Sequence, residues 1–277
     1  MSSYAQPCPA PHLPKRCRLI SREQYDLVAH LLPTPRGNAR VDAYTVLCAV
    51  LWVLSTGCYW DELAACFGKP STIYQRWRRW VIAGIAERLF EAMAGLRIQV
   101  DGIPDRPNLD SSSVKVDPAA MTGRGSHGQE HVGLSRGGKN TKIHAACAAW
   151  DFPVAVHLSA GNRYDGPQAL PLFARLGAFM GAVVNMDRAW EGERTRLSAE
   201  AMGLVPNVLP KRNRRDPWPV NVEVCKERNH IERHFLWVKR FRRINTRYDR
   251  LDAMYLAGVL LVESLLHLRK LAPDQAQ

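Results

Sequence analysis

The sequence lacks the features that would place a protein in a membrane or outside the cell. Its seven cysteines are an odd number and form no C-x-x-C pair, which argues against a disulfide framework and a zinc finger. Its longest apolar runs, residues 46–54 and 254–262, have nine residues each, whereas a membrane-spanning helix needs about 20. The first twenty residues hold four prolines and no apolar stretch typical of a signal peptide. We therefore expect a reduced, cytoplasmic protein.

Acidic residues are scarce relative to basic ones. The 277 residues include 38 Lys and Arg against 26 Asp and Glu, a formal net charge of +12 and a pI near 9.6. This excess favours a polyanionic partner, nucleic acid first and an acidic membrane second. Residues 207–250 alone hold 13 basic and 5 acidic residues. Such a concentration predicts one basic patch rather than a uniformly charged surface.

A flexible tail, residues 1–18, is expected to precede a helical domain over residues 19–96. Its helices are predicted over residues 21–32, 41–55, 60–67 and 71–94. The last two follow a helix–turn–helix rhythm. Gln75, Arg76 and Arg79 lie early on the final helix, where such side chains suit base edges and phosphates. DNA contact by this helix is the functional interpretation, and a helical bundle with a basic exposed face is the alternative.

After residue 96 the pattern changes to an α/β domain, residues 97–277. Strands are predicted over residues 109–116, 141–149, 154–158, 182–186 and 205–209. Helices are predicted over residues 165–176, 191–202, 227–241 and 251–271. This order indicates a mixed sheet with flanking helices. The Gly-rich residues 121–140 are expected to form a DNA-contacting loop, with Arg136 and Lys142 among its phosphate contacts.

Three carboxylates occupy positions where an acid is unusual. Asp110 lies near the start of the first predicted strand, Asp187 ends an apolar strand, and Glu232 lies within the most basic helix. Carboxylates at strand ends suit a hard cation such as Mg²⁺, so their convergence would make a metal site. Each one taken singly has a structural alternative: a turn residue, a helix N-cap, and an ion-pair partner of Arg228, respectively.

Two basic residues share a helix face with Glu232. Arg228 lies four residues before Glu232 and Lys239 lies seven after it, so all three side chains point in about the same direction. Phosphodiester chemistry uses this mixture, because an acid can hold a metal ion while bases hold phosphates. A basic run precedes this helix and is expected to contact DNA, with a solvated loop as the alternative. It comprises Lys211, Arg212, Arg214 and Arg215.

A four-residue signature surrounds Glu232. Cys225, Arg228, Glu232 and Lys239 are separated by two, three and six residues. This spacing resembles the tyrosine–arginine–glutamate–lysine signature of DDE insertion-sequence transposases of families four and five. Further stretches are similar to ordered blocks of family five, and the resemblance extends from about residue 19 to residue 271. These stretches are residues 109–112, 133–144, 187–190 and 227–249.

The resemblance implies a ribonuclease-H-like catalytic domain behind the helical domain. It implies that Asp110, Asp187 and Glu232 bind two Mg²⁺ ions, which Mn²⁺ can replace. The implied activity is cleavage of insertion-element ends and their joining to target DNA, with no covalent protein–DNA intermediate. The implied partners are double-stranded DNA, as terminal inverted repeats and target, and a second copy of the chain in a dimer on the bacterial nucleoid. A membrane partner is set aside, because neither basic stretch needs a lipid-facing apolar surface.

Two residues depart from the family pattern. Cys225 stands where the family usually has Tyr, and Trp190 where it has Tyr or Phe. Trp190 keeps a ring that can stack on an unpaired base or, alternatively, cover the sheet edge. Because Cys225 lacks the phenol, a decayed copy of an element stays open as an interpretation. So do a non-catalytic helix–turn–helix regulator and a metal-dependent nuclease that does not join DNA.

Overall fold

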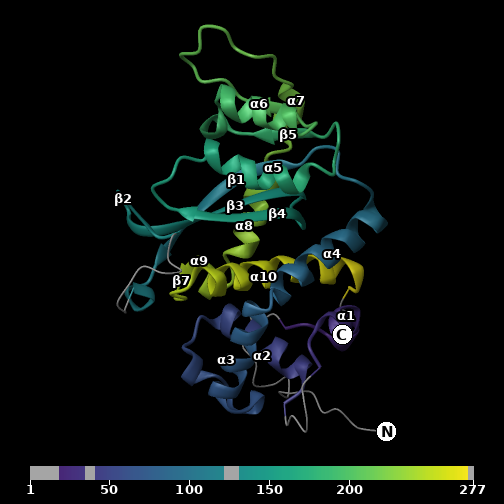
Figure 1. The fold of residues 1–277 in the computed structure, drawn as a ribbon, viewed down its shortest axis with the longest axis vertical. Coiled ribbons are helices and arrows are strands. Elements are labelled where there is room, and N and C mark those ends of the chain that lie inside the picture. Colours follow the sequence, from purple (N-terminus) through teal and green to yellow (C-terminus); the bar gives the residue numbers. More distant parts are fainter. Residues whose placement is uncertain (1–18, 35–40, 122–130, 274–277) are drawn as a thin grey trace.

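A mixed sheet organises the second half of the chain (Figure 1). The computed structural model describes residues 19–34, 41–121 and 131–273. The strands of this described part are β1 (Asn108–Val116), β2 (Gly133–Ser135), β3 (Gly138–Ala149), β4 (Phe152–Ala160), β5 (Val183–Met186), β6 (Val205–Val208) and β7 (Thr246–Arg247). β3 runs antiparallel to β1 and β4, whereas β1, β5 and β6 are mutually parallel. This topology confirms the predicted α/β, ribonuclease-H-like sheet.

Apolar residues on alternate faces of the strands pack against different helices. On one face, Leu109 and Ala146 pack with α5 (Ala169–Leu176) and α6 (Glu193–Ala201). On the other, Val114 and Cys147 join a cluster with α8 (Asn229–Val238) and α10 (Asp252–Leu271). Because successive side chains of a strand alternate between faces, Asn108 and Asp110 share the face that α8 covers.

Buried asparagines connect the three parallel strands. Asn185 Nδ2 donates to Asn108 Oδ1 over 2.8 Å, and Asn207 Nδ2 donates to Asn185 Oδ1 over 3.2 Å. The three residues are paired across β1, β5 and β6 and are almost completely buried. Asn185 also donates to Val224 O, in α7 (Val222–Lys226). We call Asn108, Asn185 and Asn207 the asparagine ladder, and it fixes both the strand register and the docking of α7.

Two of the N-terminal helices begin at side chains that cap them. The helices described in this region are α1 (Arg22–Val28), α2 (Ala43–Thr56), α3 (Pro70–Ile82) and α4 (Ile85–Asp101). Ser21 and Gln24 form a capping box at α1, and the Asp42 carboxylate caps α2. α2 ends at Gly57, whose φ of 74° suits glycine. The predicted helical domain is thus confirmed in its main elements.

Two predicted helices of this region were wrong in their extent. Residues 60–67 form two separate 3₁₀ turns, Trp60–Glu62 and Ala65–Phe67. The single helix predicted over residues 71–94 is two helices, because Gly84 takes a φ of 65° between α3 and α4. That left-handed conformation breaks the helical hydrogen bonding and costs glycine little. One glycine in a long helical pattern is compatible with a continuous helix, so the sequence signal for the break is weak.

Smaller elements in the second half were not predicted from the sequence. Within residues 121–140, the described part includes β2 and the start of β3, while residues 122–130 lie outside the described residues. Further elements without a prediction are α7, β7 and α9 (Arg242–Asn245). All are short, so their hydrophobic periodicity is too brief to recognise.

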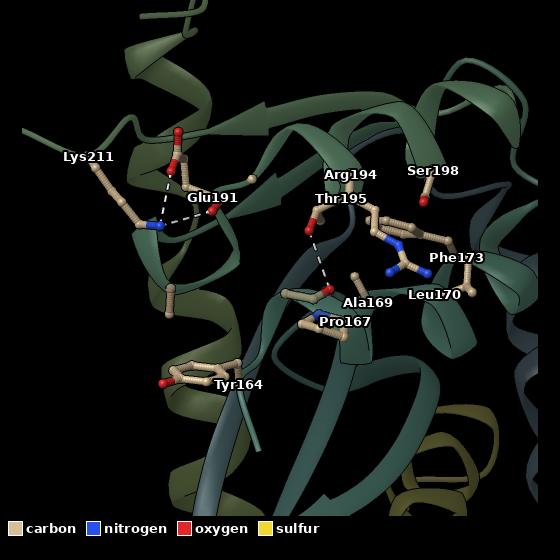
Figure 2. A pocket seen from close by; sticks show the side chains of 13 residues that line it. Tyr164, Pro167, Ala169, Leu170, Phe173, Glu191, Arg194, Thr195, Ser198 and Lys211 are labelled. Carbon is tan, nitrogen blue, oxygen red and sulfur yellow. Dashed lines mark hydrogen bonds and ion pairs between the residues drawn. The ribbon is translucent and has the colours of Figure 1, made fainter. Parts of the chain in front are cut away.

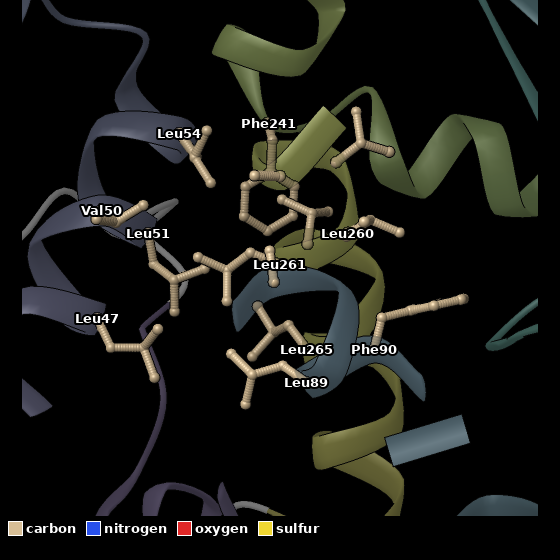
Figure 3. Packing of buried hydrophobic residues seen from close by; sticks show 14 of the residues in the cluster. Leu47, Val50, Leu51, Leu54, Leu89, Phe90, Phe241, Leu260, Leu261 and Leu265 are labelled. Atoms are coloured by element: carbon tan, nitrogen blue, oxygen red, sulfur yellow. The ribbon is translucent and has the colours of Figure 1, made fainter. Parts of the chain in front are cut away.

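One hydrophobic core joins the helical region to the sheet. In Figure 3, Leu47 and Leu51 of α2 face Leu261 and Leu265 of α10, with Leu89 of α4 beside them. α10 lies between the sheet and the N-terminal helices in Figure 1. α4 runs through the expected domain boundary at residues 96 and 97. No helix in the described residues is long and apolar enough to cross a membrane.

Replacement of the central ladder residue tests this account of the register. Asn185→Ala leaves Asn108 Oδ1 without its donor. It also removes one of the hydrogen bonds of Val224 O and one of those of Asn207 Nδ2. Because a buried polar group left unpaired costs about 1–3 kcal/mol and each further lost hydrogen bond about 0.5–1.5 kcal/mol, we expect the free energy of unfolding to fall by roughly 2–4 kcal/mol. Urea denaturation measures this. Asn213→Ala, at an exposed asparagine, should stay within about 0.5 kcal/mol of the parent, and equal losses in both variants would refute the role of the ladder.

Candidate active site

Parallel pairing brings two of the predicted acids together. Asn108 pairs with Asn185 and Leu109 with Met186, so Asp110 and Asp187 follow at neighbouring positions of β1 and β5. Asp110 Oδ1 accepts from Ser111 N over 2.7 Å. Asp187 caps the 3₁₀ turn Arg188–Trp190 and accepts from Ala189 N over 2.7 Å. Asp187 is therefore an N-cap, and its carboxylate still lies beside Asp110.

The electrostatic environment of Asp110 is unfavourable to its own charge. Burial raises the pKa of this carboxyl to about 6, and the neighbouring charges of Asp187 and Asp165 add to the increase. The Ser111 N–H and the positive charge of Arg228 oppose it. Two adjacent carboxylates with incomplete compensation are suited to a divalent cation, which prefers such hard oxygen ligands. This part of the predicted triad fits a metal ion.

The Glu232 carboxylate does not join Asp110 and Asp187 in this conformation. It lies on α8, its side chain is 61% exposed, and it pairs with Arg228 over 3.5 Å. Within the described residues, no group of three or more His, Cys, Asp or Glu side chains is placed to hold a metal ion. The ion-pair alternative for Glu232 therefore describes this structure. Arg228 links the acids, since its charge acts on Asp110 while its guanidinium holds Glu232.

The two bases that flank Glu232, Arg228 and Lys239, make different contacts. Arg228 precedes the first turn of α8, and its Nε is buried without a hydrogen-bond partner among the described residues. Lys239 Nζ donates to Ser113 O of β1 over 3.1 Å, and burial lowers the pKa of this ammonium. Ile231, Phe235 and Val238 form the buried face of α8, as the sequence predicted.

Asp165 belongs to the site, although the sequence suggested only a helix cap. Its Oδ1 accepts from Ser111 Oγ over 3.0 Å and from Lys142 Nζ over 2.9 Å. Lys142 was expected to contact phosphate. In the structure its ammonium is mostly buried and donates hydrogen bonds to Asp165 Oδ1 and to Arg163 O. The nearest sequence signal was the turn that precedes residue 166, which does not reveal a contact with a strand far away in the chain.

The predicted DNA-binding side chains fall into two groups. Lys211 and Arg214 both pair with buried Glu191, and Arg76 donates to Val41 O. By contrast, four arginines and one glutamine are exposed, and their side chains form no ion pair or hydrogen bond with a described residue. These are Arg79, Arg136, Arg212, Arg215 and Gln75. Only this second group is freely available to a polyanion without breaking an internal contact.

Both departures from the family pattern make contacts within the fold. Trp190 is completely buried and its ring meets that of His144 edge-on, with centroids 5.5 Å apart. In this conformation it cannot stack on a base, which corrects the stacking prediction and favours the alternative of a ring covering the sheet edge. Cys225 lies on α7, and its Sγ accepts from Asn207 Nδ2 over 3.5 Å. The thiol therefore extends the asparagine ladder.

Comparison with known proteins decides the family. A family described as "Transposase DDE domain" matches residues 109–262, more than half of the chain. This chain belongs to the DDE transposase family. Residues 20–90 match a family described as transposases of the IS4/5 family, which confirms the resemblance seen in the sequence. This DDE transposase therefore has family matches on both its helical region and its sheet.

Individual proteins are only remotely similar to this DDE transposase. No curated protein matches its sequence. A solved structure titled "Crystal structure of a pre-cleavage Mos1 transpososome" is similar at 12% identity, with a TM-score of 0.27, over 89% of this chain and 83% of that chain. At that TM-score the similarity carries no weight for fold or function.

The charge on Asp110 should reduce the stability of the metal-free protein. Its folded pKa, about 6, lies above its unfolded value, so folding becomes less favourable as the pH rises between the two. In buffer with EDTA at pH 7.5, we expect Asp110→Asn to have a free energy of unfolding higher than that of the parent by about 2 kcal/mol. Thermal and urea unfolding across pH measure this.

The difference should disappear near pH 4, where the parent carboxyl is protonated in the folded state. Asp105→Asn removes a carboxylate whose side chain is 85% exposed, and it should show no such pH dependence. A destabilised Asp110→Asn variant at pH 7.5 would mean that burial is not the main influence on this carboxyl.

Proposed function

We propose that this DDE transposase cleaves the ends of an insertion element and joins them to target DNA. The observation that carries the proposal is the adjacency of Asp110 and Asp187 on β1 and β5, beside the basic face of α8. Asp110, Asp187 and Glu232 are proposed as the metal-binding acids. The family signature supports Glu232 as the third, and release of its ion pair with Arg228 would free its carboxylate.

Two Mg²⁺ ions at these acids, or Mn²⁺ in their place, would supply Lewis-acid activation of an attacking oxygen and stabilise the leaving oxygen. Asp110 and Asp187 would hold the cations, and their partial burial would keep bulk water from competing. Arg228 would hold a phosphate once its ion pair with Glu232, which is long at 3.5 Å, has opened. Lys239, on the β1 side, would bind a second phosphate after leaving Ser113 O.

DNA would contact both parts of the chain. The exposed Gln75 and Arg79 of α3 and the exposed Arg212 and Arg215 support binding at two separate places. We propose a helical DNA-binding domain over residues 19–96, a catalytic domain over residues 97–277, and a dimer on paired element ends. In this proposal the protein acts in the cytoplasm, on the bacterial nucleoid. The hydrophobic core around α10 would couple the two proposed domains, because a movement of one domain relative to the other would disrupt that core.

Strand cleavage and joining test the proposal directly. With labelled element ends and Mg²⁺, we expect nicking and joining by the parent chain and a loss of at least about 100-fold in Asp110→Ala, Asp187→Ala and Glu232→Gln. Glu91→Gln is the matched control for Glu232. Its carboxylate is 59% exposed and also pairs with one arginine, Arg175, away from the proposed acids.

Each rival function gives its own result. DNA binding with no Mg²⁺-dependent nicking would identify a non-catalytic regulator or a decayed copy. Nicking without the joining of pre-cleaved ends would identify a nuclease. Full activity of Glu232→Gln would remove Glu232 from the triad.

Salt dependence tests how many bases reach phosphate. If six to ten bases do so, affinity should fall by roughly 10³–10⁵ between 50 and 200 mM salt. Because several predicted bases are internally paired, we expect the lower end of this range. Filter binding or fluorescence anisotropy measures it, and a flat response would place most of the excess charge outside the DNA interface.

A further inference from the structure

A buried glutamate pairs with two bases of the segment between β6 and α7. Lys211 Nζ lies 3.2 Å from Glu191 Oε2 and donates to Glu191 O over 3.2 Å (Figure 2). Arg214 Nε donates to Glu191 Oε1. Burial disfavours the charge on Glu191, but the hydrogen bonds from Arg214 and Lys211 outweigh burial and lower the pKa of this carboxyl. The carboxylate is therefore charged and paired on both of its oxygens.

A tryptophan adds a second contact to Arg214. The guanidinium carbon of Arg214 lies 3.5 Å from the centroid of the Trp218 ring, which is a close cation–π contact. Arg196 of α6 lies over the same ring at 5.0 Å. Arg214 is thus held by a carboxylate and by an aromatic ring.

The backbone between the two paired bases forms a turn. Arg214 N donates to Lys211 O over 3.0 Å. The side chains of Lys211 and Arg214 meet Glu191, whereas those of Arg212 and Arg215 are exposed and form no ion pair or hydrogen bond with a described residue. We call residues 211–215 the basic turn. Two of its bases hold it in place, and two are available to a polyanion.

The basic turn follows the sheet at the same end as Asp187. Met186 pairs with Val208 in the parallel register of β5 and β6, so Asp187 and the residue after Val208 leave the sheet at neighbouring positions. The chain also returns to β6, because Asn221 N donates to Asn207 Oδ1 over 2.9 Å. The segment that contains the basic turn is consequently tied at both ends to a strand beside the one that leads to Asp187.

Release of the two paired bases to DNA is unfavourable. Glu191 is buried, and depriving a buried carboxylate of its partners costs more than a solvent-exposed ion pair contributes. A phosphate is therefore expected to meet Arg212 and Arg215 while Lys211 and Arg214 stay on Glu191. Because the backbone of the basic turn is already ordered, this binding avoids the entropic cost of ordering a loop.

We propose that Glu191 is a positioning residue for DNA binding, which orders the basic turn so that Arg212 and Arg215 contact phosphates of the DNA that reaches Asp187. The proposal rests on the proposed function, because the partner is the same DNA. It also fixes the sign of an effect. Removal of an acid from a basic protein ordinarily strengthens its attraction to DNA. Removal of the Glu191 carboxylate should instead weaken binding.

A binding experiment with the full-length chain tests this sign. The probe is a short fluorescent DNA duplex, its binding is followed by anisotropy across a range of salt concentrations, and EDTA is present so that no strand is cut. Each phosphate contact contributes about 0.9 to the salt slope, so the double variant Arg212→Ala, Arg215→Ala should lose about 1.8 in slope and roughly 10–60-fold in affinity at 100 mM salt. Glu191→Gln should lose affinity in the same direction, by roughly 5–60-fold, and should cause no further loss when added to the double variant.

Two further variants make the result specific. Glu223→Gln is the matched control, because Glu223 pairs with Lys226, is 77% exposed and forms no ion pair or hydrogen bond with the basic turn. Its affinity should equal or slightly exceed that of the parent. Trp218→Ala removes the other contact of Arg214 without changing the net charge. It should weaken binding in the parent and not in the double variant, which keeps the test decisive if Glu191→Gln does not fold.

The outcomes separate this inference from the proposed function. Stronger binding and a steeper salt slope in Glu191→Gln would overturn it, since Glu191 would then withhold Lys211 and Arg214 from DNA. Unchanged binding in Glu191→Gln or in the double variant overturns it as well, and so does a loss from Glu191→Gln that persists in the double variant. Each of these results leaves the proposed function standing if the parent cleaves DNA with Mg²⁺. A parent chain that does not bind the duplex overturns both.

Discussion

Buried asparagines hold the register on which the proposed active site depends. Asn108, Asn185 and Asn207 bond one another across β1, β5 and β6, and a shift of one residue would turn these amides to the opposite, apolar face. Asp110 and Asp187 follow the first two asparagines by two residues each, so the ladder also aligns the carboxylates. Its contacts with Val224 O and Cys225 Sγ place α7, and α7 leads directly to Arg228 and α8. One polar network thus positions Asp110 and Asp187 through their strands and Glu232 through α7 and α8.

The site combines this rigidity with an electrostatic cost. Burial and two neighbouring carboxylates disfavour the charge on Asp110, while Arg228 divides its attraction between Asp110 and Glu232. Such a site gains stability when a cation or a phosphate arrives, because either one compensates a charge that the protein alone leaves poorly balanced. The large apolar core that α2, α4 and α10 share with the sheet offsets this unfavourable electrostatic energy in the free energy of folding.

Local patterns in the sequence predicted the features that depend on residues close together in the chain, namely strands and the buried faces of helices. Alternation identified the strand around Val114, and a short apolar run identified the strand around Val184. The predicted apolar stripe of α8 was correct in every member. The family signature pointed to Asp110, Asp187 and Glu232. Long-range pairings were out of reach, because nothing in the sequence links Lys142 to Asp165 or Glu191 to Lys211 and Arg214. Trp190 shows the same limit, since an aromatic residue after Asp187 is equally compatible with a surface ring and with a core position.

The central claim is that Asp110, Asp187 and Glu232 meet at one cation site when DNA is bound. Oxidative cleavage of the polypeptide by Fe²⁺ bound in place of Mg²⁺, with hydrogen peroxide and ascorbate supplied, tests it most directly. Fe²⁺ reduces the peroxide to hydroxyl radicals, which cut the backbone close to the metal, and ascorbate regenerates Fe²⁺. With DNA present, the account predicts cuts near residues 110, 187 and 232 that excess Mg²⁺ suppresses. Cuts confined to other segments, or none that Mg²⁺ suppresses, would contradict it.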